Sequence, residues 1–254
     1  MPIGEWLIPQ GVHLAFTSRN GGVSQAPYSS LNLGLHVGDD AGCVLENRTI
    51  VHQRLGLCAE PVWLEQVHGI HVHTISKSDT SASGKASMVA GGSEVPKADA
   101  CYTKVPGAVC VVMSADCLPV LFASRDGLEV AAAHAGWRGL CEGVLEATLA
   151  QFESAATDIY AYLGPAIGPT AFEVGAEVRA AFIVQDAQAE CCFEDIGGGK
   201  YLADIFALAR QRLGRAGIKH CFGDDICTYS NPSEYFSYRR DRVTGRMAAL
   251  IWRD

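Results

Sequence analysis

The chain has 254 residues, of which 48% are hydrophobic, and its formal net charge is −8. This length is enough for a sizeable buried core, and the mix of residue types is that of an α/β or α+β enzyme. The negative charge and the scattered Lys and Arg residues exclude, by composition, a protein that binds nucleic acid or anionic membrane surfaces.

The N-terminal residues MPIGEWLIPQ lack the basic start and long apolar core of a signal peptide. The most apolar window, 105–123, is interrupted by Pro106, Asp116 and Pro119, so buried strands explain it better than a membrane helix. The ten cysteines are dispersed without a CxxC pair, which excludes a zinc ribbon and favours reduced thiols. We therefore expect a cytoplasmic protein, either a monomer or a homodimer, that does not enter a membrane.

Short apolar runs bounded by turn-forming residues predict the strands. In chain order these runs are 12–17, 61–66 with a continuation at 70–75, 99–103, 108–113, 118–123, 128–133, 159–163 and 246–252. Glycine-rich or turn-rich segments at 18–22 and 29–34 follow the first strand. The order of strands and intervening helices predicts a sheet-containing fold of the α/β type.

Helices are predicted where apolar residues recur at helical spacing. The first begins at a cap, Asp39 or Asp40, and reaches about Leu55, and the others cover about 139–152, 175–184 and 203–215. Residues 76–97 are rich in Ser, Gly, Ala and Lys with little periodicity, which predicts a long mobile loop. No repeat or boundary interrupts the pattern, so we expect one domain over 1–254.

The stretch SADCLPVLFASRDGLEVAAAHAGWRG, residues 114–139, predicts a hairpin of two buried strands around Arg125-Asp126-Gly127. In such a hairpin the start of the first strand lies beside the end of the second. Cys117 and His134 are therefore expected to be neighbours. A thiol beside an imidazole suits either a nucleophile with its base or two ligands of one metal.

His68 also stands at a predicted strand end, in Gln66-Val67-His68-Gly69, and is a third candidate for the same site. A His/Cys/His set without a fourth protein ligand is typical of a catalytic zinc site. The alternative is a buried cysteine with two histidines that hydrogen-bond to the backbone. Multicopper chemistry needs more histidines than the eight in this chain, so copper is the less favoured metal.

Two further groups are candidates for binding an anion. Arg138, in Ala135-Gly136-Trp137-Arg138-Gly139, could hold a phosphate or carboxylate together with free backbone N–H groups, or could simply cap a turn. Arg239 lies in a segment of mixed aromatic and cationic residues that could stack a base and pair with an anion. An edge strand with charged flanks is the alternative for that segment.

Seven motifs in this order resemble the YfiH-like family, whose members have been labelled polyphenol oxidase (laccase) and purine nucleoside phosphorylase or adenosine deaminase. The family also includes the bacterial peptidoglycan editing factor. The motifs are TSRNGGVS (17–24), SLNL (30–33), QVHG (66–69), ADCLPV (115–120), HAGWRG (134–139), GPAI (164–167) and FSYRRD (236–241). The segment 76–97 departs from the family by its length and polarity, and could form a lid that alters the choice of substrate.

The resemblance implies a single layered α/β/β/α domain similar to the catalytic domain of cysteine-hydrolase-like toxins. It implies that His68, Cys117 and His134 form a catalytic zinc centre. We also expect four residues in or beside the matching motifs to bind substrate: Arg19, Asn32, Arg138 and Arg239.

The same resemblance implies phosphorolysis of adenosine, inosine, guanosine and methylthioadenosine, with deamination of adenosine, so the expected partners are nucleoside and phosphate. One alternative is a cysteine-type hydrolase that edits muramyl-peptide precursors of the cell wall, with Cys117 as nucleophile and His134 as base. A copper-dependent polyphenol oxidase is a third hypothesis.

Overall fold

The computed structural model of the chain describes residues 6–80 and 95–254. Its strands are β1 (Val12–Phe16), β2 (Val72–Thr74), β3 (Ala100–Thr103), β4 (Val109–Ser114), β5 (Leu118–Ser124), β6 (Val130–Ala135), β7 (Ile159–Leu163), β8 (Glu173–Gly175), β9 (Phe193–Gly197), β10 (Lys200–Ala203), β11 (His220–Phe222) and β12 (Met247–Arg253). Its α-helices are α1 (Ala41–Leu55), α2 (Lys77–Thr80), α3 (Trp137–Glu142), α4 (Val144–Leu149), α5 (Ala176–Gln185), α6 (Ile205–Arg215) and α7 (Tyr238–Asp241).

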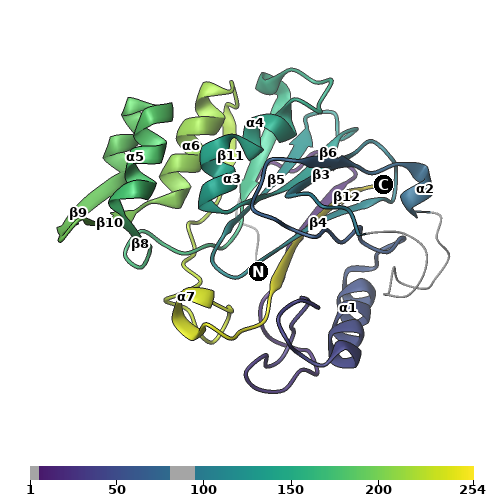
Figure 1. Cartoon of the computed structure of the whole chain (residues 1–254). Helices are drawn as coiled ribbons and strands as arrows, with labels where there is room; N and C mark the ends of the chain where they lie inside the picture. Colours follow the sequence, from purple (N-terminus) through teal and green to yellow (C-terminus); the bar gives the residue numbers. More distant parts are fainter. Residues whose placement is uncertain (1–5, 81–94) are drawn as a thin grey trace.

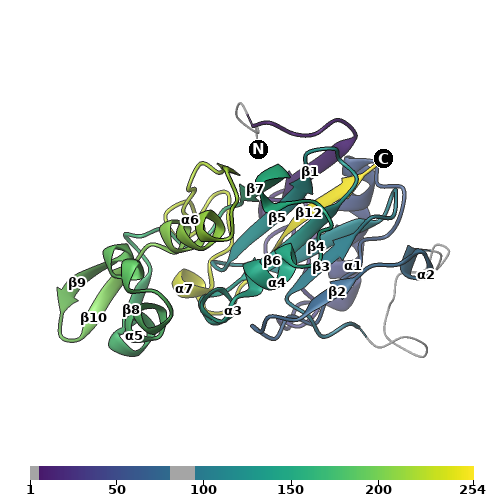
Figure 2. The same ribbon diagram turned by 90° about the horizontal axis from the view of Figure 1, so that it is seen from above.

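Two sheets form the centre of the molecule. A six-stranded sheet has the order β11-β7-β5-β6-β3-β2, and a three-stranded antiparallel sheet has the order β1-β12-β4. Figure 2 shows both sheets between α4 and α6 on one side and α1 on the other. This arrangement confirms the predicted α/β class with its α/β/β/α layers.

Each interface between layers has its own apolar core. Leu14, Val112, Leu121 and Ile251 lie in the core between the two sheets. The outer face of the six-stranded sheet packs against α3, α4 and α6, and the outer face of the three-stranded sheet packs against α1. Strand β5 serves two cores because successive side chains point to opposite faces, and all of its residues are buried.

The central hairpin is confirmed. Strands β5 and β6 pair antiparallel, with Leu118 opposite Ala135 and Pro119 opposite His134. Asp126 and Ser124 close the turn through the hydroxyl of Ser124, which donates to Asp126 Oδ1 at 2.6 Å. The register brings the residues just before β5 to the end of β6, as the pattern of apolar runs indicates.

The prediction of a single helix over 139–152 is wrong. The segment forms two short helices, α3 and α4, separated by Gly143, whose φ is 107°. A residue in this left-handed region cannot continue a right-handed helix. Leu140 in α3 and Val144 and Leu145 in α4 are all buried, so the apolar residues of both helices still face the core as the pattern indicates.

The prediction of a strand over 61–66 is also wrong. This segment makes isolated bridges, Val62 with Cys110 and Glu65 with Lys97. The side chain of Gln66 replaces a strand partner, because it donates to the carbonyl of Met113 at 2.8 Å and accepts from the Met113 N–H at 2.7 Å. The expected continuation is present as β2.

Other parts of the fold were not anticipated. Strands β8, β10 and β9 form a third sheet next to α5, at the side of the molecule remote from α1 (Figure 1). Within the loop expected at 76–97, Lys77–Thr80 form α2, and residues 81–94 lie outside the described residues. In the described part of the chain, the helices are all too short or too polar to span a membrane.

Candidate metal centre

His68, Cys117 and His134 come together at one end of the central hairpin. Their ligand atoms all lie within 4.8 Å of one another, and Cys117 Sγ is 4.0 Å from His68 Nε2. His134 is buried, Cys117 is half-buried and His68 is exposed. The cluster is therefore closed on the side of His134 and open to solvent on the side of His68.

Asp99, directly before β3, connects both histidines, and sequence reasoning missed it. Its Oδ1 lies 2.9 Å from His134 Nδ1 and also accepts the N–H of His68 at 2.9 Å. Its Oδ2 accepts the N–H groups of Val67 and Gly69. A carboxylate at Nδ1 fixes the ring so that Nε2 is the nitrogen available to the cluster. The signal in the sequence is an acidic residue between Ala98 and Ala100 in an apolar strand.

Cys117 and His134 each stabilise the charged form of the other. Burial raises the pKa of the Cys117 thiol, but the charge of His134 and the hydrogen bonds of both histidines lower it to about 6. Burial lowers the pKa of His134, while Cys117 and Asp99 raise it to about 9. Without a metal, the two groups form a thiolate–imidazolium pair near neutral pH.

The cluster fits a zinc ion by its donors and by its spacing. One thiolate and two imidazole nitrogens are a ligand set found in catalytic zinc sites, which leaves one position open. Zinc bonds of about 2.3 Å to sulfur and about 2.1 Å to nitrogen together exceed the Cys117–His68 separation, so one ion can contact both atoms. A Cβ at Gly136 would lie 2.9 Å from His68 Cδ2 and 3.1 Å from Cys117 Sγ. Glycine at 136 is therefore required for His68 and Cys117 to lie this close to the turn.

Asp116 ties the C-terminal segment to the cluster, and it too was not among the predicted site residues. Its carboxylate accepts from Thr228 Oγ1 at 2.6 Å, Ser237 Oγ at 3.0 Å and the Arg239 N–H at 2.7 Å. Its φ of 102° turns the chain sharply just before Cys117. The start of α7 is thereby fixed beside the cysteine.

The four expected substrate-binding residues lie in different surroundings. Arg19 donates to the carbonyls of Ser29 and Pro232 and lies over the Phe236 ring. Asn32 is fully buried and bonds to Gly34, Asp39 and the N–H of Arg246.

Arg138 is exposed next to the cluster at the start of α3, with its guanidinium over Trp137. The Arg239 guanidinium donates to the Glu173 carbonyl. Substrate binding by all four residues stays a prediction.

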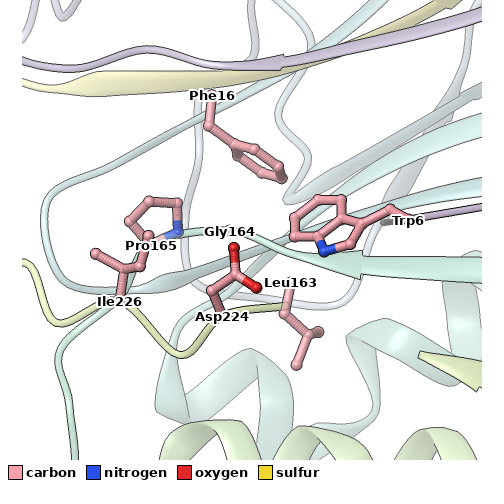
Figure 3. A pocket seen from close by; sticks show the side chains of 7 residues that line it. All are labelled: Trp6, Phe16, Leu163, Gly164, Pro165, Asp224 and Ile226. Atoms are coloured by element: carbon pink, nitrogen blue, oxygen red, sulfur yellow. The ribbon is translucent and has the colours of Figure 1, made fainter. Parts of the chain in front are cut away.

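A narrow crevice at the Gly164-Pro165 turn is separate from the cluster. Trp6, Phe16 and Ile226 line it with the carboxylate of Asp224 (Figure 3). It is apolar, and its lining includes none of His68, Cys117 and His134. The open side of the cluster is therefore the better candidate for chemistry.

The fold and the cluster define an α/β/β/α protein with a His/Cys/His site of the kind that holds a catalytic metal. Residues 13–254 match the family described as multi-copper polyphenol oxidoreductase laccase, and the chain belongs to this family. The match confirms the YfiH-like resemblance.

Relatives and solved structures agree with this assignment. The chain is 52% identical over 250 residues to the Escherichia coli K12 protein named purine nucleoside phosphorylase YfiH, covering 98% of this chain and 97% of that one. It resembles the crystal structure of a Neisseria meningitidis protein of the DUF152 family, with a TM-score of 0.89, 47% identity and coverage of 99% and 98%. For YlmD from Geobacillus stearothermophilus the TM-score is 0.86, with 34% identity and coverage of 96% and 92%.

Proposed function

We propose that the protein is a purine nucleoside phosphorylase that also deaminates adenosine, with its reaction centre at His68, Cys117 and His134. The observation that carries the proposal is the clustering of these side chains on an open side of the fold. The names of the close relatives support a phosphorylase. The proposed substrates are adenosine, inosine, guanosine and methylthioadenosine.

The proposed cofactor is zinc held by His68, Cys117 and His134, which would supply a Lewis acid and a water of lowered pKa. The protein's own groups prepare the centre. Asp99 orients His134 and holds the His68 loop through three backbone N–H groups. Glycine at 136 lets the side chains of His68 and Cys117 approach this turn closely.

The two proposed reactions differ in their co-substrate, which is phosphate in one and water in the other. In phosphorolysis, a phosphate oxygen bonds to C1′ of the ribose and the C1′–N bond breaks. The bonding electrons stay on the purine nitrogen, which takes a proton. In deamination, the oxygen of water replaces the 6-amine, which leaves as ammonia. The first reaction requires phosphate and the second does not, so product analysis separates them.

The test is to incubate wild-type protein and Cys117→Ala with adenosine or inosine, with and without phosphate, and to separate the products. We expect adenine and ribose 1-phosphate from adenosine only with phosphate, and inosine in both conditions. Cys117→Ala should reduce both rates about 100-fold or more, as expected when transition-state stabilisation is lost. Cys58→Ala is the matched control, because Cys58 is an exposed thiol outside the cluster. Absence of all these products, or full activity of Cys117→Ala, would contradict the proposal.

A cysteine-type hydrolase that edits muramyl-peptide precursors is the second candidate. The observation that favours it is the Cys117–His134 pair with Asp99 behind the imidazole, an arrangement that activates a nucleophilic thiol. Activity on such a precursor that survives exhaustive chelation, with a trapped thioester at Cys117, would select it.

Copper-dependent phenol oxidation, suggested by the family description, is third, and the copper content of the purified protein tests it.

A further inference from the structure

The backbone of Arg246 is held on both sides, next to the end of β4. It directly precedes β12, whose first residue, Met247, pairs with Ser114 at the end of β4. The Arg246 N–H donates to Asn32 Oδ1 at 2.8 Å, and its carbonyl accepts from Leu33 at 3.1 Å. Ser114 is three residues before Cys117 in the sequence. The backbone of Arg246 is therefore fixed at the end of β4, shortly before the chain reaches Cys117.

The positive charge of Arg246 is not paired with a carboxylate in the described part of the chain. Its Nη1 donates to the carbonyls of Thr244 and Gly245, which leave the charge uncompensated. Burial lowers the pKa of Arg246, while the negative charges of Cys117 and Asp116 raise it. Asp116 is the neighbouring carboxylate, and its oxygens already accept three hydrogen bonds.

His36 and Arg246 converge on Gly34. A Cβ at Gly34 would lie 2.8 Å from Arg246 Cγ and 3.4 Å from His36 Cε1. The ring nitrogens of the exposed His36 bond to none of the described residues. Partial burial and the charges of Arg246 and Arg48 lower the pKa of His36, so its ring is a neutral donor beside the guanidinium. Arg48 adds a second positive charge near Gly34. Its guanidinium donates to the carbonyl of Leu33, the residue before Gly34, and stacks on the Trp63 ring.

Tyr238 forms the other side of this region. It is 51% exposed, and the guanidinium carbons of Arg242 and Arg246 both lie 5.9 Å from its ring centroid. Its helix, α7, begins directly after Ser237. The Ser237 hydroxyl and the Arg239 N–H both donate to the Asp116 carboxylate. Tyr238, Arg246 and His36 thus lie around one region, and the neighbours of Tyr238 bond to Asp116, the residue before Cys117.

We propose that Arg246 and His36, with Tyr238 beside them, form the subsite that binds inorganic phosphate for the reaction at the His68/Cys117/His134 cluster. A guanidinium suits a phosphate because its planar donors can bond two oxygens at once. The role in catalysis rests on the proposed phosphorolysis, whereas the binding of phosphate does not. The subsite also accounts for a cation next to Cys117 that the metal centre does not use.

The experiment measures inorganic phosphate binding by isothermal titration calorimetry, without nucleoside, for wild type, Arg246→Gln and His36→Gln. Loss of a charged hydrogen bond should weaken phosphate binding about 10- to 100-fold in Arg246→Gln. Arg246→Lys should restore part of the affinity, because it keeps the charge but not the planar fork. Arg125→Gln is the matched control, since Arg125 is an exposed arginine at the far end of the hairpin.

Kinetics then separate this subsite from the proposed function. With inosine as substrate, Arg246→Gln should raise KM for phosphate about 10-fold or more and change KM for inosine less than about twofold. If wild type binds phosphate and Arg246→Gln does not, but no nucleoside is cleaved, the proposed function fails and the subsite stands. Lack of phosphate binding by wild type, or equal affinity in wild type and Arg246→Gln, overturns the subsite. Circular dichroism checks folding, and the exposed His36→Gln gives an independent result if Arg246→Gln is unfolded.

Discussion

At the scale of single residues, Asp99 determines how the cluster is assembled. Its side chain is fully buried, yet it accepts from His134 and from three consecutive backbone N–H groups of the His68 loop. Burial raises the pKa of this carboxyl, but the bond to His134 and the backbone N–H groups hold the pKa below its usual value. One carboxylate thus positions two of the three proposed metal ligands.

Asp99→Asn should weaken both the fold and metal binding. The amide cannot accept all these bonds, and its NH₂ group would face a backbone donor. We expect the free energy of unfolding of the metal-free protein to fall by about 2 to 3 kcal/mol and zinc affinity to fall about 10- to 100-fold. Urea denaturation and competition with a chelating dye measure these changes. Asp126→Asn, in the exposed hairpin turn, should leave zinc affinity unchanged, and a wild-type affinity in Asp99→Asn would refute the role of Asp99.

The reactivity of Cys117 in metal-free protein should depend on pH in a defined way. Its pKa is lowered to about 6, so the thiolate is present above that pH and is lost as the pH falls through it. Protonated His134, whose pKa is about 9, stabilises the thiolate throughout this window. Alkylation by iodoacetamide, followed by mass spectrometry of the Cys117 peptide, should be half-maximal near pH 6. A midpoint near the value of a free thiol, about 8.5, would show that the pair does not form.

Sequence reasoning found Cys117 and His134 because the hairpin register depends only on local apolar runs and a turn. His68 was found as a candidate because the sequence placed it at the end of a strand that the structure does not contain, and its contact with the cluster depends on Asp99. Arg246 was missed, since its place beside the end of β4 depends on pairing between β12 and β4, which are separated by more than a hundred residues. Such long-range pairing leaves no periodic signal in the sequence.

At the scale of elements, Gly143 shows why the pattern of apolar residues predicted one helix where two exist. Burial against the sheet sets the apolar spacing, whereas the break depends on a single backbone conformation. A Cβ at Gly143 would make ordinary contacts of 3.5 Å with Arg212 and 3.6 Å with Glu146. The constraint at this position is therefore the φ of 107° rather than lack of space.

Gly143→Ala should lower the free energy of unfolding by about 1 to 2 kcal/mol, because a side chain is disfavoured in the left-handed region. Gly214→Ala is the matched comparison. Gly214 lies inside α6 with nothing within 4 Å of its Cβ position, so alanine should stabilise the protein by about 0.5 to 1 kcal/mol. Chemical denaturation of both variants measures the difference. Equal effects at the two positions would contradict this explanation of the α3–α4 break.

At the scale of the whole molecule, the layers follow from which faces of the sheets are apolar, and this much was predictable. Strand β5 is buried on both faces, as its continuous apolar run indicates. The third sheet was not predictable, because its strands are short and mostly exposed and include the charged segment Phe193–Gly197. The site is a product of the whole fold, since the His68 loop, the hairpin and the start of α7 all contribute to it.

We propose that His68, Cys117 and His134 hold the metal of the reaction centre. The most direct measurement is the metal content of protein purified without chelators, by inductively coupled plasma mass spectrometry, for wild type and Cys117→Ser. We expect about one zinc per wild-type chain and a large loss in Cys117→Ser, because a hydroxyl is a poor replacement for a thiolate ligand. A wild-type protein without bound metal, or equal zinc in both proteins, would contradict it.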